Sequence, residues 1–215
     1  MDNPEKRLRE IIRILRKSYP QSRTALHFES PLQILIATIL SAQCTDKKVN
    51  EITPSLFSKY KTATDFAQAD PQKLEEEIRP TGFFRNKTKN IIEACKKIVS
   101  DYSGKVPDNM NELILLPGVA RKTANIVLSS GFKKAEGIAV DTHVKRLSGR
   151  LGLSGESNPD KIEQDLMRIV PKSDWLDFNY ILVNHGRAVC QAKKPDCEHC
   201  EINHLCPYYQ NLQKN

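Results

Sequence analysis

Three segments of the sequence open with the same pair, a residue whose side chain can cap a helix followed by a proline. The pairs are Ser30-Pro31, Asp70-Pro71 and Asn158-Pro159. Ser, Asp and Asn side chains accept hydrogen bonds from the first N–H groups of a helix, and the fixed φ of proline suits the first helical position. Gln33, three residues after Ser30, also fits the capping-box pattern. The sequence therefore predicts helices that begin at residues 31, 71 and 159.

Apolar residues recur at helical spacing along most of the chain. One example is the stripe formed by Ile91, Ile92, Cys95, Ile98 and Val99. Alternating runs rich in Val, Ile and Thr, which would indicate strands, are nearly absent. We therefore expect an all-α fold with Cys95 in its core. The expected helices span 4–18, 31–42, 46–59, 71–78, 85–102, 108–116, 120–131, 142–151, 159–170 and 174–189.

The charge balance and the start of the chain limit the class of protein. The net charge is +7 with a pI of about 9.1, which favours a polyanionic partner without establishing one. The segment MDNPEKRLREIIRIL has no apolar core typical of a signal peptide, and the apolar run 34–40 is far shorter than the ~20 residues of a membrane span. We expect an intracellular protein without a membrane partner. Its thiols should stay reduced and bind a metal centre rather than form disulfides.

Four of the six cysteines form a group near the end of the chain with the spacing C-x6-C-x2-C-x5-C. They are Cys190, Cys197, Cys200 and Cys206. Four thiolates suit either zinc or a [4Fe–4S] cluster. Zinc sites usually combine two short hooks, and here only Cys197 and Cys200 form one. Because His199 and His204 lie nearby, the spacing alone leaves both metals open.

The segment 113–124, LILLPGVARKTA, has two helical stretches that meet at Pro117-Gly118. This junction is too tight for an ordinary loop and is typical of a helix-hairpin-helix. The backbone amides of such a hairpin can hold a phosphate without reading a base sequence. A match this short is more often a simple corner between helices, so it does not decide the function alone.

Lys122 falls in the first turn of the helix that follows the hairpin, and Asp141 falls in the segment VDTH beyond the next loop. The positive end of a helix and the neighbouring Arg121 both disfavour the ammonium form of the lysine. A neutral amine can attack a sugar carbon and form a Schiff base, and a carboxylate can orient the amine or stabilise positive charge. An exposed lysine at a helix start and a loop aspartate are also common without any such role.

These motifs occur together and in order. The segments LPGVARKTAN, AVDTHV and NHGRAVC and the cysteine spacing resemble the endonuclease III family of helix-hairpin-helix/Gly-Pro-Asp DNA glycosylases. The resemblance runs from about Leu32 to Cys206. It implies two all-α domains with DNA in the cleft between them. One would be a six-helix bundle at 24–134, and the other would join 1–23 to 135–215, with 132–140 as the connecting loop and the first helix packed against the C-terminal helices.

The resemblance also implies an activity. The protein would act in base excision repair, as a monomer on double-stranded DNA with damaged bases or abasic sites, in the cytoplasm of a prokaryote at its nucleoid. Lys122 would be the nucleophile and Asp141 its carboxylate partner. The enzyme would excise oxidised pyrimidines and cleave the abasic strand by β-elimination.

The same resemblance assigns the four cysteines to a [4Fe–4S] cluster that shapes a DNA-binding loop. Lys193 and Lys194 lie between the first two cysteines, and a loop fixed in this way could press them onto phosphates. The alternative for both lysines is an ordinary solvated surface.

Two positions match residues that enter the duplex when a nucleotide is flipped. Gln43, in LSAQCTD, would fill the space left by the nucleotide, and Phe83, in TGFFRN, would be a wedge where the family usually has Leu. The alternatives are a polar residue at a helix end for Gln43 and a core aromatic for Phe83. Gly118 would serve the hairpin, where Ala120 replaces a second glycine. Cys44, next to Gln43, is expected to be a small buried residue.

Three rival interpretations remain. An adenine glycosylase of the same family has a catalytic Glu where this chain has Ala37, and a thymine-mismatch glycosylase usually has Tyr where this chain has Lys122. A non-catalytic DNA-binding protein with a zinc-bound tail would keep the hairpin, the charge and the thiols. In that last class, Lys122 and Asp141 would be a coincidence.

Overall fold

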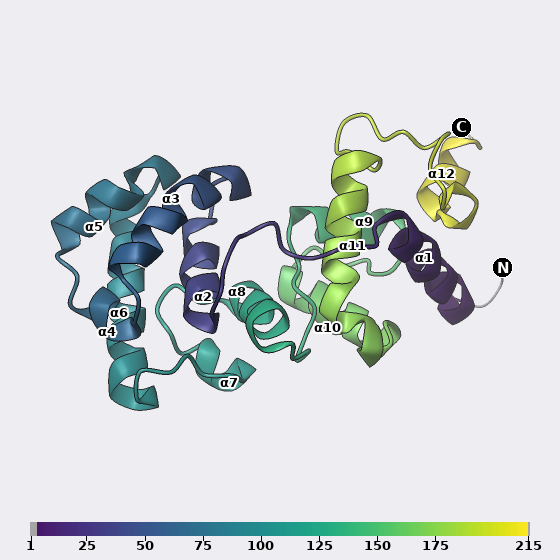
Figure 1. The fold of residues 1–215 in the computed structure, drawn as a ribbon. Helices are drawn as coiled ribbons and strands as arrows, with labels where there is room; N and C mark the ends of the chain where they lie inside the picture. The colour runs from purple at the N-terminus through teal and green to yellow at the C-terminus, as the bar shows by residue number, and fades with distance from the viewer. Residues whose placement is uncertain (1–3, 215) are drawn as a thin grey trace. The chain divides into compact units, whose positions relative to one another are not determined.

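The computed structural model describes residues 4–214, and within these residues the chain forms helices and no strand (Figure 1). The all-α prediction is confirmed. The helices are α1 (Pro4–Ser18), α2 (Pro31–Leu40), α3 (Asp46–Lys59), α4 (Ala63–Ala67), α5 (Pro71–Ile78), α6 (Phe84–Tyr102), α7 (Met110–Leu113), α8 (Arg121–Ile126), α9 (Thr142–Arg150), α10 (Pro159–Ile169), α11 (Trp175–Ala188) and α12 (Pro207–Leu212). Short helical turns are η1 (Arg79–Thr81), η3 (Lys172–Asp174) and η4 (Asn203–Leu205), and η2 (Val127–Phe132) continues α8 as a π-helix. No helix in this part of the chain is both long and apolar enough to cross a membrane.

The three predicted helix starts are confirmed, with Pro31, Pro71 and Pro159 in the first turns of α2, α5 and α10. The Ser30 side chain accepts a hydrogen bond of 3.2 Å from the backbone N–H of Gln33. The predicted capping box is wrong, however. The Gln33 side chain accepts from the backbone N–H of Glu29 at 2.8 Å, one residue before the cap, and so it fixes the entry to α2 instead.

Three other helices differ from the prediction. The helix expected at 108–116 is limited to α7, because the chain tightens into i→i+3 hydrogen bonds at Leu115 and Leu116 before the hairpin turn. The sequence analysis missed α4, which begins with a capping box between Thr62 and Asp65. It also missed α12, whose first residue is the proline after Cys206.

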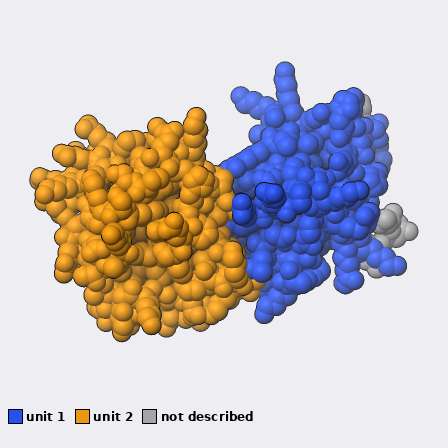
Figure 2. Space-filling model, viewed as in Figure 1, with its two compact units in different colours: residues 1–23, 137–215 blue, residues 24–136 orange. Residues whose placement is uncertain are grey.

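The chain forms two compact units (Figure 2). One contains residues 24–136 and is called the hairpin unit here. The other contains residues 1–23 and 137–215 and is called the cysteine unit. Each has its own cluster of buried apolar side chains.

The hairpin unit is built around α2 and α6. Seven consecutive residues of α2, Ile34–Leu40, are buried, which explains why this helix is apolar on every side. The longer α6 packs against α2, α4 and α5, and Cys95 on its apolar stripe is fully buried, as predicted. Burial raises the pKa of the Cys95 thiol to about 12. This cysteine is therefore an inert part of the core.

The cysteine unit joins the two ends of the chain. Helix α1 packs against α11, which confirms the predicted packing of the first helix on the C-terminal helices. The Arg16 guanidinium binds Asp174 at 2.9 Å and Asp177 at 2.8 Å, just before and within α11. Helix α11 also packs along α9, so the helix that precedes the cysteines is held on two sides.

Candidate functional site

The hairpin between α7 and α8 depends on the glycine at its centre. Gly118 has φ +77°, a left-handed conformation that side chains rarely adopt. A Cβ atom at this position would lie 2.8 Å from the Cβ of Asn90 on α6. The turn therefore needs a glycine for its backbone conformation and for its close packing on α6.

Ala120 has no such requirement. It is the exposed N-cap residue of α8, with φ −87° and ψ 170°, an extended conformation open to any residue. The methyl group that replaces the family's second glycine therefore causes no backbone strain at the start of α8.

Lys122 is the second residue of α8, and its side chain is exposed. It makes no hydrogen bond or ion pair with another residue among those described at 4–214. The amine is therefore accessible from solvent in the first turn after the hairpin. That position is the one predicted for a nucleophile.

Asp141 is the N-cap of α9 in the cysteine unit and is half-buried. Its Oδ1 accepts a hydrogen bond of 2.8 Å from the backbone N–H of Val144. The cap fixes the carboxylate while the other oxygen, Oδ2, has no hydrogen-bond donor among the described residues. Lys122 and Asp141 belong to different compact units.

Gln43 and Phe83 share an unusual backbone conformation. Both have positive φ, 53° for Gln43 and 47° for Phe83, which costs a residue with a side chain roughly 1–2 kcal/mol. Gln43 is exposed, and Phe83 is 60% exposed, which excludes the core interpretation of this aromatic residue. Cys44 was expected to be buried, but it is half-buried, because the turn that projects Gln43 outward also lifts its neighbour partly out of the core.

The sequence analysis missed Lys87, a buried lysine on α6 that is only 4% exposed. Its Nζ donates hydrogen bonds of 2.7 Å to the carbonyl of Leu40 and 2.8 Å to the carbonyl of Thr81. Burial lowers the pKa of the Lys87 ammonium. The sequence did carry a signal, because Lys87 stands four residues before Ile91 on the apolar stripe, where a solvated lysine is not expected.

The four clustered cysteines line one cavity of about 370 Å³ in the cysteine unit, a volume that includes its open mouth. They come from the end of α11, the loop after it and the start of α12. All six cysteines of the chain carry free thiols. The four thiols therefore converge on one space although they are spread over residues 190–206.

Two residues that the sequence analysis missed contact these thiols. The Arg150 guanidinium donates a hydrogen bond of 3.2 Å to the Sγ of Cys190, and the Nε2 of His185 lies 3.5 Å from the Sγ of Cys200. Burial lowers the pKa of His185 to about 4, so this imidazole is neutral. Burial also raises the pKa of Cys197 and brings that of Cys200 to about 11, so a metal that binds them displaces their protons.

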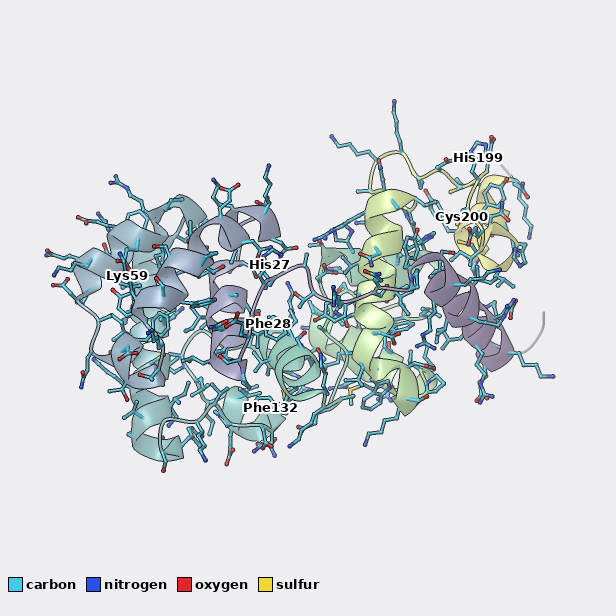
Figure 3. All side chains as sticks on the ribbon, viewed as in Figure 1. His27, Phe28, Lys59, Phe132, His199 and Cys200 are labelled. Atoms are coloured by element: carbon cyan, nitrogen blue, oxygen red, sulfur yellow. The ribbon has the colours of Figure 1, made fainter. Side chains whose placement is uncertain are left out.

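The arrangement does not suit a single zinc ion. Across residues 4–214, no three His, Cys, Asp or Glu side chains are spaced to hold one metal ion. The two histidines that kept zinc open are not among the residues that line the cavity. Both are exposed, and the Nδ1 of His199 instead lies 2.8 Å from a carboxylate oxygen of Asp196 (Figure 3). A donor set of four thiols around a wider space fits a multinuclear iron–sulfur centre better than zinc.

Lys193 and Lys194 lie in the loop between Cys190 and Cys197, and both are exposed. The same loop is fixed from below by Arg150, which donates to the carbonyls of Gln191 at 2.8 Å and Ala192 at 3.0 Å. The two lysines are therefore presented on a short segment whose backbone is anchored at its start.

The turn between α7 and α8 places this chain among the helix-hairpin-helix proteins. Residues 36–172 match the model of a family described as HhH-GPD superfamily base excision DNA repair protein. The chain is 53% identical over 210 residues to Endonuclease III from Synechocystis sp., which covers 98% of this chain and 96% of the relative. The chain belongs to the HhH-GPD superfamily of base excision DNA repair proteins, as its motifs predicted.

Two solved structures have the same fold. One is described as "Structure of a non-covalent Endonuclease III-DNA Complex", with a TM-score of 0.91 and 39% identity over 98% of this chain and 99% of that chain. The other is "Structure of a Trapped Endonuclease III-DNA Covalent Intermediate: Estranged-Adenine Complex", with a TM-score of 0.91 and 39% identity over 97% and 98%. The similarity extends over both compact units.

Proposed function

We propose that this protein is a bifunctional DNA glycosylase and abasic-site lyase of base excision repair that acts on oxidised pyrimidines in double-stranded DNA. Its family and its near full-length similarity to proteins named Endonuclease III support this activity. The observation that carries the proposal is the accessible Lys122 amine in the first turn after the hairpin. We infer that it works as a single chain on the DNA of a prokaryotic cytoplasm.

Lys122 supplies the nucleophile. Its amine attacks C1′ of the damaged nucleotide, the base leaves with the electrons of the glycosidic bond, and the resulting imine links the lysine to the opened sugar. The imine makes the C2′ proton acidic, so its removal expels the 3′ phosphate by β-elimination. One covalent intermediate thus accounts for both base release and strand cleavage.

Asp141 supplies a fixed negative charge. Because its Oδ1 caps α9, the carboxylate is held in one orientation, and Oδ2 is available to the reacting centre. A carboxylate there stabilises positive charge as it develops on the sugar and can accept a proton from the amine. We assign the two functions of Asp141, cap and catalyst, to its two oxygens.

Four positions are assigned to the duplex itself. Gln43 fills the space of the flipped nucleotide, and Phe83 is the wedge beside it, in agreement with the exposure of both side chains. The hairpin at Gly118 and Ala120 holds a phosphate with backbone amides. These contacts position the damaged strand without reading its sequence.

The four cysteines are assigned to a [4Fe–4S] cluster, since they form a four-thiol donor set around one cavity. When bound, the cluster ties residues 190–206 together through its iron–thiolate bonds. Arg150 holds the Cys190 sulfur and the adjoining backbone, and His185 lies against the Cys200 sulfur. Lys193 and Lys194 then meet DNA phosphates from a fixed loop.

A strand-cleavage assay tests the proposed function. A duplex with one oxidised pyrimidine, such as thymine glycol, is incubated with the protein, and the free base and the DNA ends are identified. We expect base release together with the unsaturated sugar end left by β-elimination. Release of the base with an intact abasic strand would contradict the lyase assignment, and no release from any oxidised pyrimidine would contradict the proposed function.

A further inference from the structure

Two turns of the hairpin unit each contain a left-handed residue that is not glycine and that points out of the core. Gln43 has φ 53° and Phe83 has φ 47°. Residues with side chains keep this conformation only where the surrounding structure enforces it. Some group must therefore hold each turn.

Lys87 contacts the residues that lead into both turns. Its Nζ lies 2.7 Å from the carbonyl oxygen of Leu40, which is three residues before Gln43. It also lies 2.8 Å from the carbonyl oxygen of Thr81, which is two residues before Phe83. In addition, the backbone N–H of Lys87 donates a hydrogen bond of 3.1 Å to the carbonyl of Phe83 itself. A single buried side chain thus connects the two turns.

The chemistry of this contact explains why it is a lysine. Leu40 is the last residue of α2, where carbonyl groups lack partners within the helix and where a positive charge is favoured. Thr81 is 2% exposed and Lys87 is 4% exposed, so neither carbonyl gains a water molecule easily. A neutral apolar side chain at position 87 would leave two buried carbonyl groups without a donor, which favours rearrangement of both turns.

We propose that Lys87 is a positioning residue for base flipping: it holds the turns of Gln43 and Phe83 at a fixed separation, so that the two side chains enter the duplex together. This inference rests on the proposed function, because it assigns a joint task to the two duplex-entering side chains. Lys87 itself touches neither the sugar nor the base. Its effect is confined to substrates whose nucleotide must be extracted from a paired stack.

The test compares two substrates that differ in how much opening they need. The first is a fully paired duplex with thymine glycol, from which the nucleotide must be flipped. The second is a single-stranded oligonucleotide with a preformed abasic site, which needs no flipping before the lysine attacks. Both reactions are measured under single-turnover conditions, and the readout is the ratio of the duplex rate to the single-strand rate.

We expect Lys87→Met to lower this ratio by about 10- to 100-fold, the scale of a misplaced positioning group. The matched control is Lys89→Met, which removes an exposed lysine from the same helix and should leave the ratio unchanged. General destabilisation would slow both reactions alike. An unchanged ratio for Lys87→Met would overturn the proposal.

A double-mutant cycle provides the second arm. If Lys87 acts through the two turns, Gln43→Ala should lower the duplex rate much less in the Lys87→Met background than in the wild-type background. Additive losses would mean that Lys87 acts elsewhere. If Lys87→Met does not fold, Lys87→Gln replaces it, because its shorter amide keeps a polar group but cannot reach both carbonyls, and the same fall in the ratio is expected.

The wild-type protein separates this proposal from the proposed function. If the wild type does not excise thymine glycol, the proposed function fails regardless of Lys87. If the wild type does excise it and the ratio for Lys87→Met equals the wild-type ratio, only the inference on Lys87 fails.

Discussion

The guanidinium of Arg150 donates a hydrogen bond of 3.2 Å to the Sγ of Cys190, which connects the last residue of α9 to the cysteine cavity. The first residue of α9 follows Asp141, so one helix of nine residues links the proposed catalytic carboxylate to the first thiol of the cavity. Within the cysteine unit, the loop that carries Lys193 and the cap that orients Asp141 therefore share one rigid support.

The first prediction concerns the cysteines. Cys197→Ala removes one of four thiols, so the protein should lose its iron, its C-terminal loop should become disordered and its DNA affinity should fall. Iron content, visible absorbance and a binding titration measure these effects. Cys95→Ala is the control, because this buried thiol lies in the other unit and its loss should lower stability but leave the iron in place. A Cys197→Ala protein with full iron and full affinity would refute the assignment.

The second prediction separates the two functions of Asp141. Asn caps a helix about as well as Asp, so Asp141→Asn should leave the free energy of unfolding nearly unchanged, while Asp141→Ala should lower it by about 1 kcal/mol. Both variants should slow base excision by roughly 10²-fold or more, because both remove the charge. Denaturant unfolding and single-turnover excision are compared. Full activity of the Asn variant would show that Asp141 is only a cap.

The third prediction concerns the hairpin. Gly118→Ala should lower the free energy of unfolding by about 1–2 kcal/mol and weaken binding to all DNA sequences, because φ +77° and the contact with Asn90 both oppose a methyl group. Ala120→Gly is the matched variant, and it should change affinity little, since φ −87° suits either residue. Equal effects at the two positions would contradict this account of the turn.

The fourth prediction concerns the exposed lysines of the cysteine loop. Replacing Lys193 and Lys194 with Ala should weaken binding to all sequences alike and reduce the salt slope of log K by up to about 0.9 per lost phosphate contact. Replacing Lys96 and Lys97 removes the same charge from α6, where both lysines form ion pairs within the helix. That control should change the slope less. If both pairs give the same slope, the cysteine loop has no special role in phosphate binding.

The sequence predicted those parts of the fold that depend on neighbouring residues. The bounds of α5, Pro71–Ile78, are those predicted, because a capping Asp, a proline and an apolar stripe all lie within its ten or so residues. The length of α7 could not be predicted, since it depends on how the hairpin turn packs against Asn90. Motifs shared with a family revealed the candidate residues, although their spacing alone would not have done so.

Contacts between residues distant in sequence remained out of reach. Arg150 and Cys190 are separated by 40 positions, and Lys87 and Leu40 by 47. Arg150 reads as a surface cation at the end of a helix, and Lys87 reads as one of many lysines on α6. Only the packed structure shows that one holds a thiol and the other two buried carbonyls.

The covalent adduct between Lys122 and DNA tests the central claim most directly. An abasic duplex is mixed with the protein in the presence of borohydride, which reduces a lysine–sugar imine to a stable link, and the attached residue is identified by mass spectrometry of the digested adduct. We expect the link on Lys122 in the wild type, and no adduct from Lys122→Gln although this variant still binds the duplex. An adduct formed by Lys122→Gln at the wild-type rate, or attached to another amine in the wild type, would contradict the assignment of Lys122 as the nucleophile.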